Sequence, residues 1–185
     1  MLYTRKGDSG TTKTFGCDQR ISKSSSVAEA LGSLDETNSF LGLVRAKTKG
    51  MIFKTTLGKK SFPEVVLDIQ QNLFIVQAEV AGSTLSITPE KITKAESIVD
   101  EIEKVLPPIK SFFISGATEV GALFDVARTF SRRAERRVVA VKEEGRVSVS
   151  AETMTYLNRL SSLLYALARI SSHVEGAEEI KPDYK

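Results

Sequence analysis

The sequence is poor in the side chains that build disulfides and metal sites. Of its 185 residues, Cys17 is the single cysteine and His173 the single histidine. One cysteine excludes a disulfide within the chain and favours a reducing compartment. One histidine excludes a zinc site built from several imidazoles of the same chain.

Long hydrophobic runs and a strong charge of one sign are also missing. No stretch of about 18 apolar residues occurs, and the first ten residues, MLYTRKGDSG, lack the apolar core of a signal peptide. The net charge is only +3, from 26 basic and 23 acidic residues, which disfavours a protein that holds nucleic acid by bulk charge. We therefore expect a soluble, cytoplasmic protein that binds neither membranes nor nucleic acid.

Apolar residues recur at steps of three and four, as they do in amphipathic helices. We expect helices over about 24–48, 63–85, 89–106, 116–144 and 150–175, with a basic connection over 47–63. No long segment alternates polar and apolar residues as a strand does. The sequence therefore predicts an all-α fold in a single domain: an up-and-down bundle of about five helices over 24–175, with an irregular N-terminal arm over 1–23 and a polar C-terminal tail over 176–185.

The helix expected over 116–144 carries a dense set of positive charges. Its apolar stripe consists of Leu123, Ala127, Phe130, Ala134, Val138 and Val141, and five arginines fall within ten residues: Arg128, Arg132, Arg133, Arg136 and Arg137. Like charges at this spacing repel each other unless anions lie beside them. Two interpretations follow, a solvated basic face or a clamp in which guanidinium groups bind phosphate or carboxylate.

The N-terminal arm combines glycines, hydroxyl groups and cations. Between Thr4 and Lys13 it has two glycines three residues apart and three basic side chains. Glycine lets the backbone turn so that consecutive N–H groups face one anion, and hydroxyl and ammonium groups complete a phosphate site. Neither G-x-x-x-x-G-K-[ST] nor G-x-G-x-x-G is present. A flexible polar arm and a phosphate-binding loop both remain open.

Two further features have alternative interpretations. Asp35, in the middle of the first helix, is either a surface acid or the partner of an arginine on a neighbouring helix or subunit. The segment 109–116 contains Phe112 and Phe113 between Pro108 and Gly116. This aromatic pair is either a hydrophobic plug at the end of the bundle or the wall of a pocket for a large flat ligand.

Five blocks of the sequence occur in the order seen in PduO-type ATP:cob(I)alamin adenosyltransferases. They are TRKGDSGTT (4–12), LGSLDETN (31–38), Phe112 with its loop, RTFSRRAER (128–136) and YLNRLS (156–161). From residue 3 to about 170 the chain resembles this family. It departs from the pattern at Ser24-Ser25, where an acidic pair is usual, at Ser115-Gly116-Ala117, where Pro-Gly-Gly is usual, and at Ser162, where an acid is common.

The resemblance implies a homotrimer of helical bundles with active sites between neighbouring subunits. It implies transfer of the 5′-deoxyadenosyl group of ATP to the cobalt of cob(I)alamin, giving adenosylcobalamin and triphosphate. Mg²⁺ would arrive with ATP, without direct ligands from the chain, and a flavoprotein reductase or an adenosylcobalamin-dependent mutase would be a partner. The alternative is a non-catalytic bundle that binds or delivers ATP or a corrinoid.

The resemblance also implies roles for single residues. Arg132, Arg128, Asp35 and Phe112 match catalytic positions, with Asp35 and Arg128 in a salt bridge across the subunit boundary. Phe112 matches the aromatic that contacts cobalamin and displaces its lower axial base. The implied ATP-binding residues are Thr4, Arg5, Lys6, Gly7, Thr12, Lys13, Lys23, Arg132, Arg133, Ala134, Glu135, Arg136 and Asn158.

Overall fold

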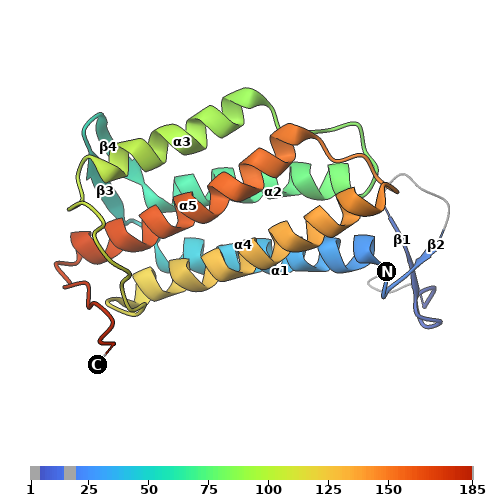
Figure 1. Ribbon diagram of the computed structural model, residues 1–185, viewed down its shortest axis with the longest axis horizontal. Coiled ribbons are helices and arrows are strands. Elements are labelled where there is room, and N and C mark those ends of the chain that lie inside the picture. The colour runs from blue at the N-terminus through green and yellow to red at the C-terminus, as the bar shows by residue number, and fades with distance from the viewer. Residues whose placement is uncertain (1–4, 15–19, 185) are drawn as a thin grey trace.

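The fold is known from a computed structural model, which describes residues 5–14 and 20–184 (Figure 1). Five helices dominate it: α1 (Ser26–Lys47), α2 (Phe62–Val80), α3 (Pro89–Glu103), α4 (Glu119–Glu144) and α5 (Ala151–Val174). Two hairpins accompany them, β1 (Thr11–Lys13) with β2 (Arg20–Ser22) and β3 (Ile52–Thr55) with β4 (Gly58–Ser61). The prediction of an all-α bundle of five helices is confirmed.

The first hairpin corrects an expectation, because the N-terminal arm was predicted to be irregular; the second gives strands to the 47–63 segment, which was predicted only to be a basic connection. Both pairs are antiparallel, with Thr12 opposite Ile21 and Ile52 opposite Ser61. Strands of three and four residues are too short to show alternation in the sequence. The second hairpin joins the core through Phe53, whose ring centroid lies 4.6 Å from that of Phe62.

The helices begin at polar caps. The side chains of Ser25, Ser61, Thr118 and Ser150 each accept a hydrogen bond from a backbone N–H in the first turn of α1, α2, α4 and α5. Such a cap satisfies one of the unpaired donors at a helix start. α4 ends at Gly145, whose φ of 68° is a left-handed conformation that glycine adopts without strain.

Three predicted helix limits were too wide. α2 ends at Val80, so Leu85 lies outside it and is 58% exposed rather than in the apolar stripe. Gly82, with φ of 96°, turns the chain away directly after this helix. α3 ends before Leu106, and α4 begins three residues after Gly116. Apolar residues beyond a helix end continued the pattern and hid the boundary.

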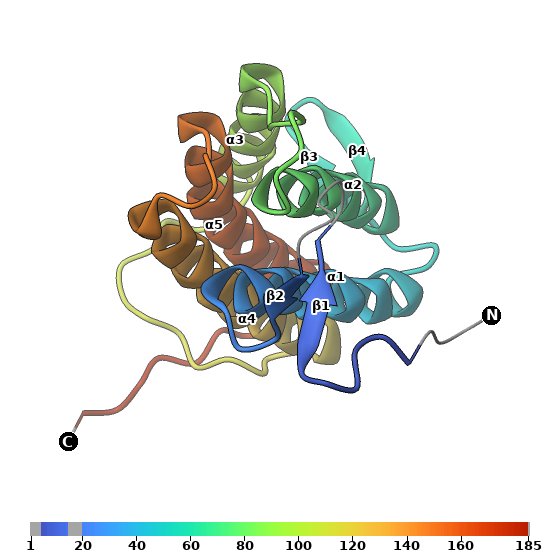
Figure 2. The same cartoon turned by 90° about the vertical axis from the view of Figure 1, so that its right-hand side faces the viewer.

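The helices pack side by side around one core (Figures 1 and 2). α4 contacts both α1 and α5, while α2 packs on α1 and α3 on α5. Because α4 has two neighbours, its buried face differs from the predicted stripe: Phe124 and Ser131 are buried, whereas Leu123 and Phe130 are only partly buried.

The two ends of the bundle differ. The β1–β2 hairpin lies at the end where α1 begins, and the chain segment between α3 and α4 lies at the opposite end (Figure 1). The C-terminal segment is at that second end too. The candidate phosphate-binding arm and the aromatic residues of one chain are therefore separated by the length of the bundle.

Candidate functional site

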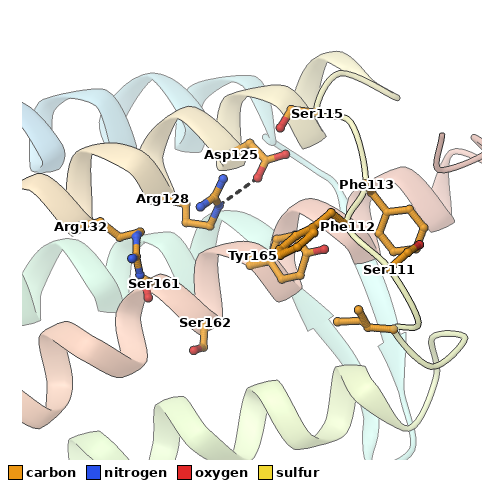
Figure 3. A pocket seen from close by; sticks show the side chains of 11 residues that line it. Ser111, Phe112, Phe113, Ser115, Asp125, Arg128, Arg132, Ser161, Ser162 and Tyr165 are labelled. Atoms are coloured by element: carbon orange, nitrogen blue, oxygen red, sulfur yellow. Dashed lines mark hydrogen bonds and ion pairs between the residues drawn. The ribbon is translucent and has the colours of Figure 1, made fainter. Parts of the chain in front are cut away.

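A cavity of about 520 Å³ lies between α4, α5 and the aromatic loop, which we define as residues 107–117 (Figure 3). Phe112, 79% exposed, lines this cavity, so the interpretation of Phe112 as a plug of the core is wrong. An apolar wall with a few polar groups is typical of small-molecule sites. The lining residues are Ile109, Ser111, Phe112, Phe113, Ser115, Asp125, Arg128, Arg132, Ser161, Ser162 and Tyr165.

Arg128 is held at the cavity by its own helix. Its Nε donates to Oδ1 of Asp125 at 3.1 Å, and its guanidinium carbon lies 5.9 Å from the ring centroid of Tyr165 (Figure 3). Asp35 is exposed on α1 and does not line the cavity. The implied bridge between Asp35 and Arg128 joins two subunits and stays a prediction.

Arg132 lies one turn further along α4, beside Ser161 of α5 in Figure 3. Arg132 is exposed, and its guanidinium has no carboxylate partner among the described residues. A guanidinium without an internal counter-ion remains available to an anion that enters the cavity. Arg136 follows on α4 and is exposed as well.

The other two arginines of α4 turn toward α1. Arg133 pairs with Glu36 and its guanidinium carbon lies 5.0 Å from the ring centroid of Phe130, while Arg137 Nε lies 3.3 Å from Oε1 of Glu29. These pairs bridge two helices at a partly exposed surface. Arg133 and Arg137 thus contact α1, Arg128 and Arg132 line the cavity, and Arg136 is exposed. Neither sequence interpretation describes all five.

The remaining α4 and α5 residues of the implied nucleotide site form a bridge between the two helices. Asn158 Nδ2 donates to Oε1 of Glu135 at 3.2 Å, and Arg159 Nη1 donates to Oδ1 of Asn158 at 2.9 Å. Arg159 also pairs with Glu96 of α3 at 2.7 Å. Ala134 is fully buried in the core.

The arm folds into a compact turn. The backbone N–H of Lys23 donates to the carbonyl of Gly10 at 2.9 Å, and Gly10 has φ of 77°. A Cβ at position 7 would lie 3.1 Å from Nζ of Lys23, so the absence of a side chain at Gly7 lets this lysine approach the turn closely. The structure therefore places Gly7 beside the Lys23 side chain, and Lys6 is exposed.

The other implied residues of the arm are placed around this turn. Thr12 lies in β1 opposite Ile21, and Lys13 is exposed at the end of the strand. Arg5 is exposed and has φ of 57°, an uncommon value for a residue with a side chain. Thr4 lies outside the described residues.

Arg20 organises the arm, and the sequence reasoning missed it. Its Nε donates to Oγ1 of Thr11 and its Nη2 to the carbonyl of Thr11, both at 2.8 Å, and Nη2 also donates to the carbonyl of Lys6. The only signal would have been the hairpin register, which pairs Lys13 with Arg20. The sequence reasoning also missed Asp125 and Tyr165. Asp125 lies on the same face of α4 as Arg128, three residues later, and Tyr165 lies on the same face of α5 as Asn158, seven residues earlier.

Neither a metal cluster nor a membrane-crossing helix is found within the described ranges, 5–14 and 20–184. No group of three or more His, Cys, Asp or Glu side chains there is arranged to hold a metal ion. None of the helices in these ranges combines the length and apolar character that crossing a membrane requires.

Sequence comparisons identify relatives over almost the whole chain. The family model for cobalamin adenosyltransferase matches residues 2–171. The corrinoid adenosyltransferase PduO of Citrobacter freundii is 37% identical over 179 residues, which are 93% of this chain and 50% of that protein. The chain thus spans about half the length of the PduO relatives. A corrinoid adenosyltransferase of Bacillus subtilis is 33% identical over 184 residues, 97% of this chain and 91% of that protein.

A solved structure has the same fold. It is a variant of a PduO-type ATP:corrinoid adenosyltransferase from Lactobacillus reuteri complexed with cobalamin and ATP, with a TM-score of 0.86 and 26% identity. The match covers 100% of this chain and 97% of that one. The resemblance seen in the five ordered blocks extends to the fold and to the sequence as a whole, and this chain belongs to the cobalamin adenosyltransferase family.

Proposed function

We propose that this protein transfers the 5′-deoxyadenosyl group of ATP to the cobalt of cob(I)alamin. The observation that carries the proposal is one cavity with an aromatic wall at Phe112 and, at its other side, the guanidinium of Arg132, which has no carboxylate partner in the part of the chain that the structure describes. A flat corrinoid ring suits the aromatic wall, and a polyphosphate suits the guanidinium. The relatives named above carry the same activity in their names.

The chemistry accounts for the types of residue present. The cobalt of cob(I)alamin supplies the electron pair that forms a bond to C5′ of ATP. As that bond forms, the bond between C5′ and its oxygen breaks, and triphosphate leaves with the electron pair of the broken bond. The protein needs no Ser, Cys or His nucleophile, which agrees with a chain that has one histidine.

The role of the basic residues is to stabilise the leaving group. Negative charge grows on the triphosphate as the C5′–O bond breaks, so cations placed beside it act more strongly in the transition state than in the ground state. We assign this role to Arg132 and to Lys23 over its glycine turn, with Arg5, Lys6 and Lys13 as further phosphate contacts. Mg²⁺ bound to ATP would neutralise part of the same charge.

Phe112 serves the other substrate. Its exposed ring would occupy the lower axial face of the corrinoid, displacing the axial base and keeping water away. Four-coordinate cob(II)alamin is easier to reduce than the five-coordinate form, so this contact would bring the reduction within reach of a flavoprotein reductase. Ser115 and Ser162, which depart from the family pattern, line the same cavity. These two departures would affect the binding of the corrinoid more than the binding of ATP.

The assembly we propose is a homotrimer with sites at the subunit boundaries. The arm and the aromatic loop of one chain lie at opposite ends of the bundle (Figure 1), so a site that contains both draws them from two chains. The cytoplasm is the proposed compartment, because a lone cysteine suits a reducing environment.

The test is anaerobic incubation of the purified protein with ATP, Mg²⁺ and chemically reduced cobalamin. We expect the absorbance change of adenosylcobalamin formation and one triphosphate released for each molecule formed. Samples without ATP or without protein serve as controls. Tight binding of both substrates with no triphosphate release would reject the enzyme and favour the delivery protein.

A further inference from the structure

The C-terminal segment, which we define as residues 177–184, folds back onto the aromatic loop. The backbone N–H of Ile114 donates to the carbonyl of Ile180 at 2.8 Å. Both segments lie at the same end of the bundle, beyond the end of α5 (Figure 1). The end of the chain was expected to be a polar tail, but it makes a backbone contact with the loop that carries Phe112.

A buried arginine joins these two segments. The side chain of Arg169, on α5, is only 6% exposed. Its Nε and Nη2 donate to the two carboxylate oxygens of Glu179 at 2.7 and 2.6 Å. The same Nη2 lies 3.3 Å from the carbonyl of Pro107, and the guanidinium carbon lies 5.1 Å from the ring centroid of Phe113. One side chain thus contacts the start of the loop, its middle and the C-terminal segment.

These contacts lie directly behind the wall of the cavity. A small recess lined by Arg169 and Glu179 shares four lining residues with the main cavity: Phe113, Ser115, Asp125 and Tyr165. Arg169 itself does not line the main cavity, so it reaches any ligand there only through other residues. Phe113, stacked on Arg169, is the direct neighbour of Phe112 in the chain.

We propose that Arg169 is a positioning residue, which fixes the aromatic loop against the C-terminal segment through Glu179 and so sets where Phe112 stands over the cavity. The proposal rests on the function proposed above, because it makes corrinoid binding depend on this clamp. A bidentate pair suits the task, since the planar guanidinium fixes both distance and orientation.

The first experiment needs no substrate. In Glu179→Gln the buried guanidinium loses its counter-ion, so the contact between the two segments opens more often. We expect the amide proton of Ile114, read by NMR, to exchange with deuterium on the order of tenfold faster or more, with core amides of α4 and α5 unchanged. The matched control is Glu178→Gln, which makes the same change at the exposed neighbour. Unchanged exchange at Ile114 would overturn the clamp.

The second experiment measures the effect on the reaction. Glu179→Gln and Arg169→Lys should raise the KM for cob(I)alamin while the KM for ATP stays at the wild-type value. Lysine keeps the positive charge but lacks the planar guanidinium that donates two parallel hydrogen bonds to a carboxylate. Arg169→Lys should therefore retain more corrinoid affinity than Arg169→Ala. An equal rise in both KM values, or none, would show that Arg169 does not position the loop. A wild-type protein without turnover would reject the proposed function alone, because the exchange measurement still tests the clamp.

Discussion

Two arginines one turn apart on α4 have different electrostatic environments. Arg128 has a carboxylate partner three residues earlier in its own helix, whereas Arg132 has none in the described part of the chain. Both face the same cavity. Arg128 is therefore partly neutralised before any ligand arrives, and Arg132 is the stronger candidate for an external anion.

Replacing Arg132 tests this difference. Arg132→Ala should lower kcat by about 10²–10³, the loss seen when one donor to a developing anion is removed. Its far-ultraviolet circular dichroism should match the wild type, because Arg132 is exposed. The control is Arg146→Ala, an exposed arginine after the end of α4. Full turnover in Arg132→Ala would remove this residue from the proposed mechanism.

The sequence could predict the cavity-facing arginines better than their neighbours. The helical period alone places Arg128 and Arg132 on one face. The helical period does not predict that Arg133 and Arg137 pair with α1 instead of facing the cavity. Their partners Glu36 and Glu29 lie about a hundred residues earlier, on a helix whose packing against α4 depends on the whole fold. Arg20 was missed for the same reason, since its contacts depend on the register of a hairpin.

Whole elements were predictable where the apolar pattern was long. All five helices were expected, and their caps are readable as Ser or Thr before the first turn. The β3–β4 hairpin was missed because it is short and is held by tertiary contacts rather than by its own pattern. One of these contacts is Glu101 of α3, which is buried and accepts from Oγ1 of Thr55 at 2.7 Å and pairs with Lys60 at 3.2 Å.

Glu101 makes the stability of this element depend on pH. Burial by itself raises the pKa of Glu101, but hydrogen bonds from Thr55, Lys60 and Ser97 outweigh burial and lower this pKa below the ordinary value of 4.5. A carboxylate whose folded pKa is depressed stabilises the fold above its unfolded pKa and loses that effect as the pH falls through the folded value. Glu101→Gln should therefore cost about 1–3 kcal/mol in the free energy of unfolding at pH 7.

Urea denaturation at a series of pH values measures this effect. The difference in unfolding free energy between wild type and Glu101→Gln should shrink as the pH drops below 4.5. Glu143→Gln, at an exposed position near the end of α4, should show little difference at any pH. A constant difference across the series would mean that the charge of Glu101 contributes nothing.

At the scale of the whole molecule, one chain does not bring the arm to the cavity. The arm and the aromatic loop lie at opposite ends of the bundle. Asp35 on α1 does not line the cavity that its implied partner Arg128 lines. A sequence contains no direct record of which surfaces of two copies meet. The resemblance can therefore name the residues of a shared site. Whether those residues come together in one site depends on how the subunits assemble in the proposed trimer.

Subunit mixing tests that assembly. Asp35→Ala and Arg128→Ala should each reduce turnover when expressed alone, because every boundary lacks one member of the pair. Co-expression of the two variants should restore part of the activity, since some boundaries then combine Asp35 of one chain with Arg128 of another. Light scattering should give three times the chain mass of 20.2 kDa. No recovery in a mixed trimer would contradict a bridge between subunits.

Arg20 holds the backbone near Lys6 and Thr11 through contacts within the chain itself, and none of these contacts requires a nucleotide. A segment that is ordered in advance loses less conformational entropy when it binds, and more of the interaction energy appears as affinity. A calorimetric titration with ATP would then show a smaller entropic penalty than one for an arm that orders only on contact.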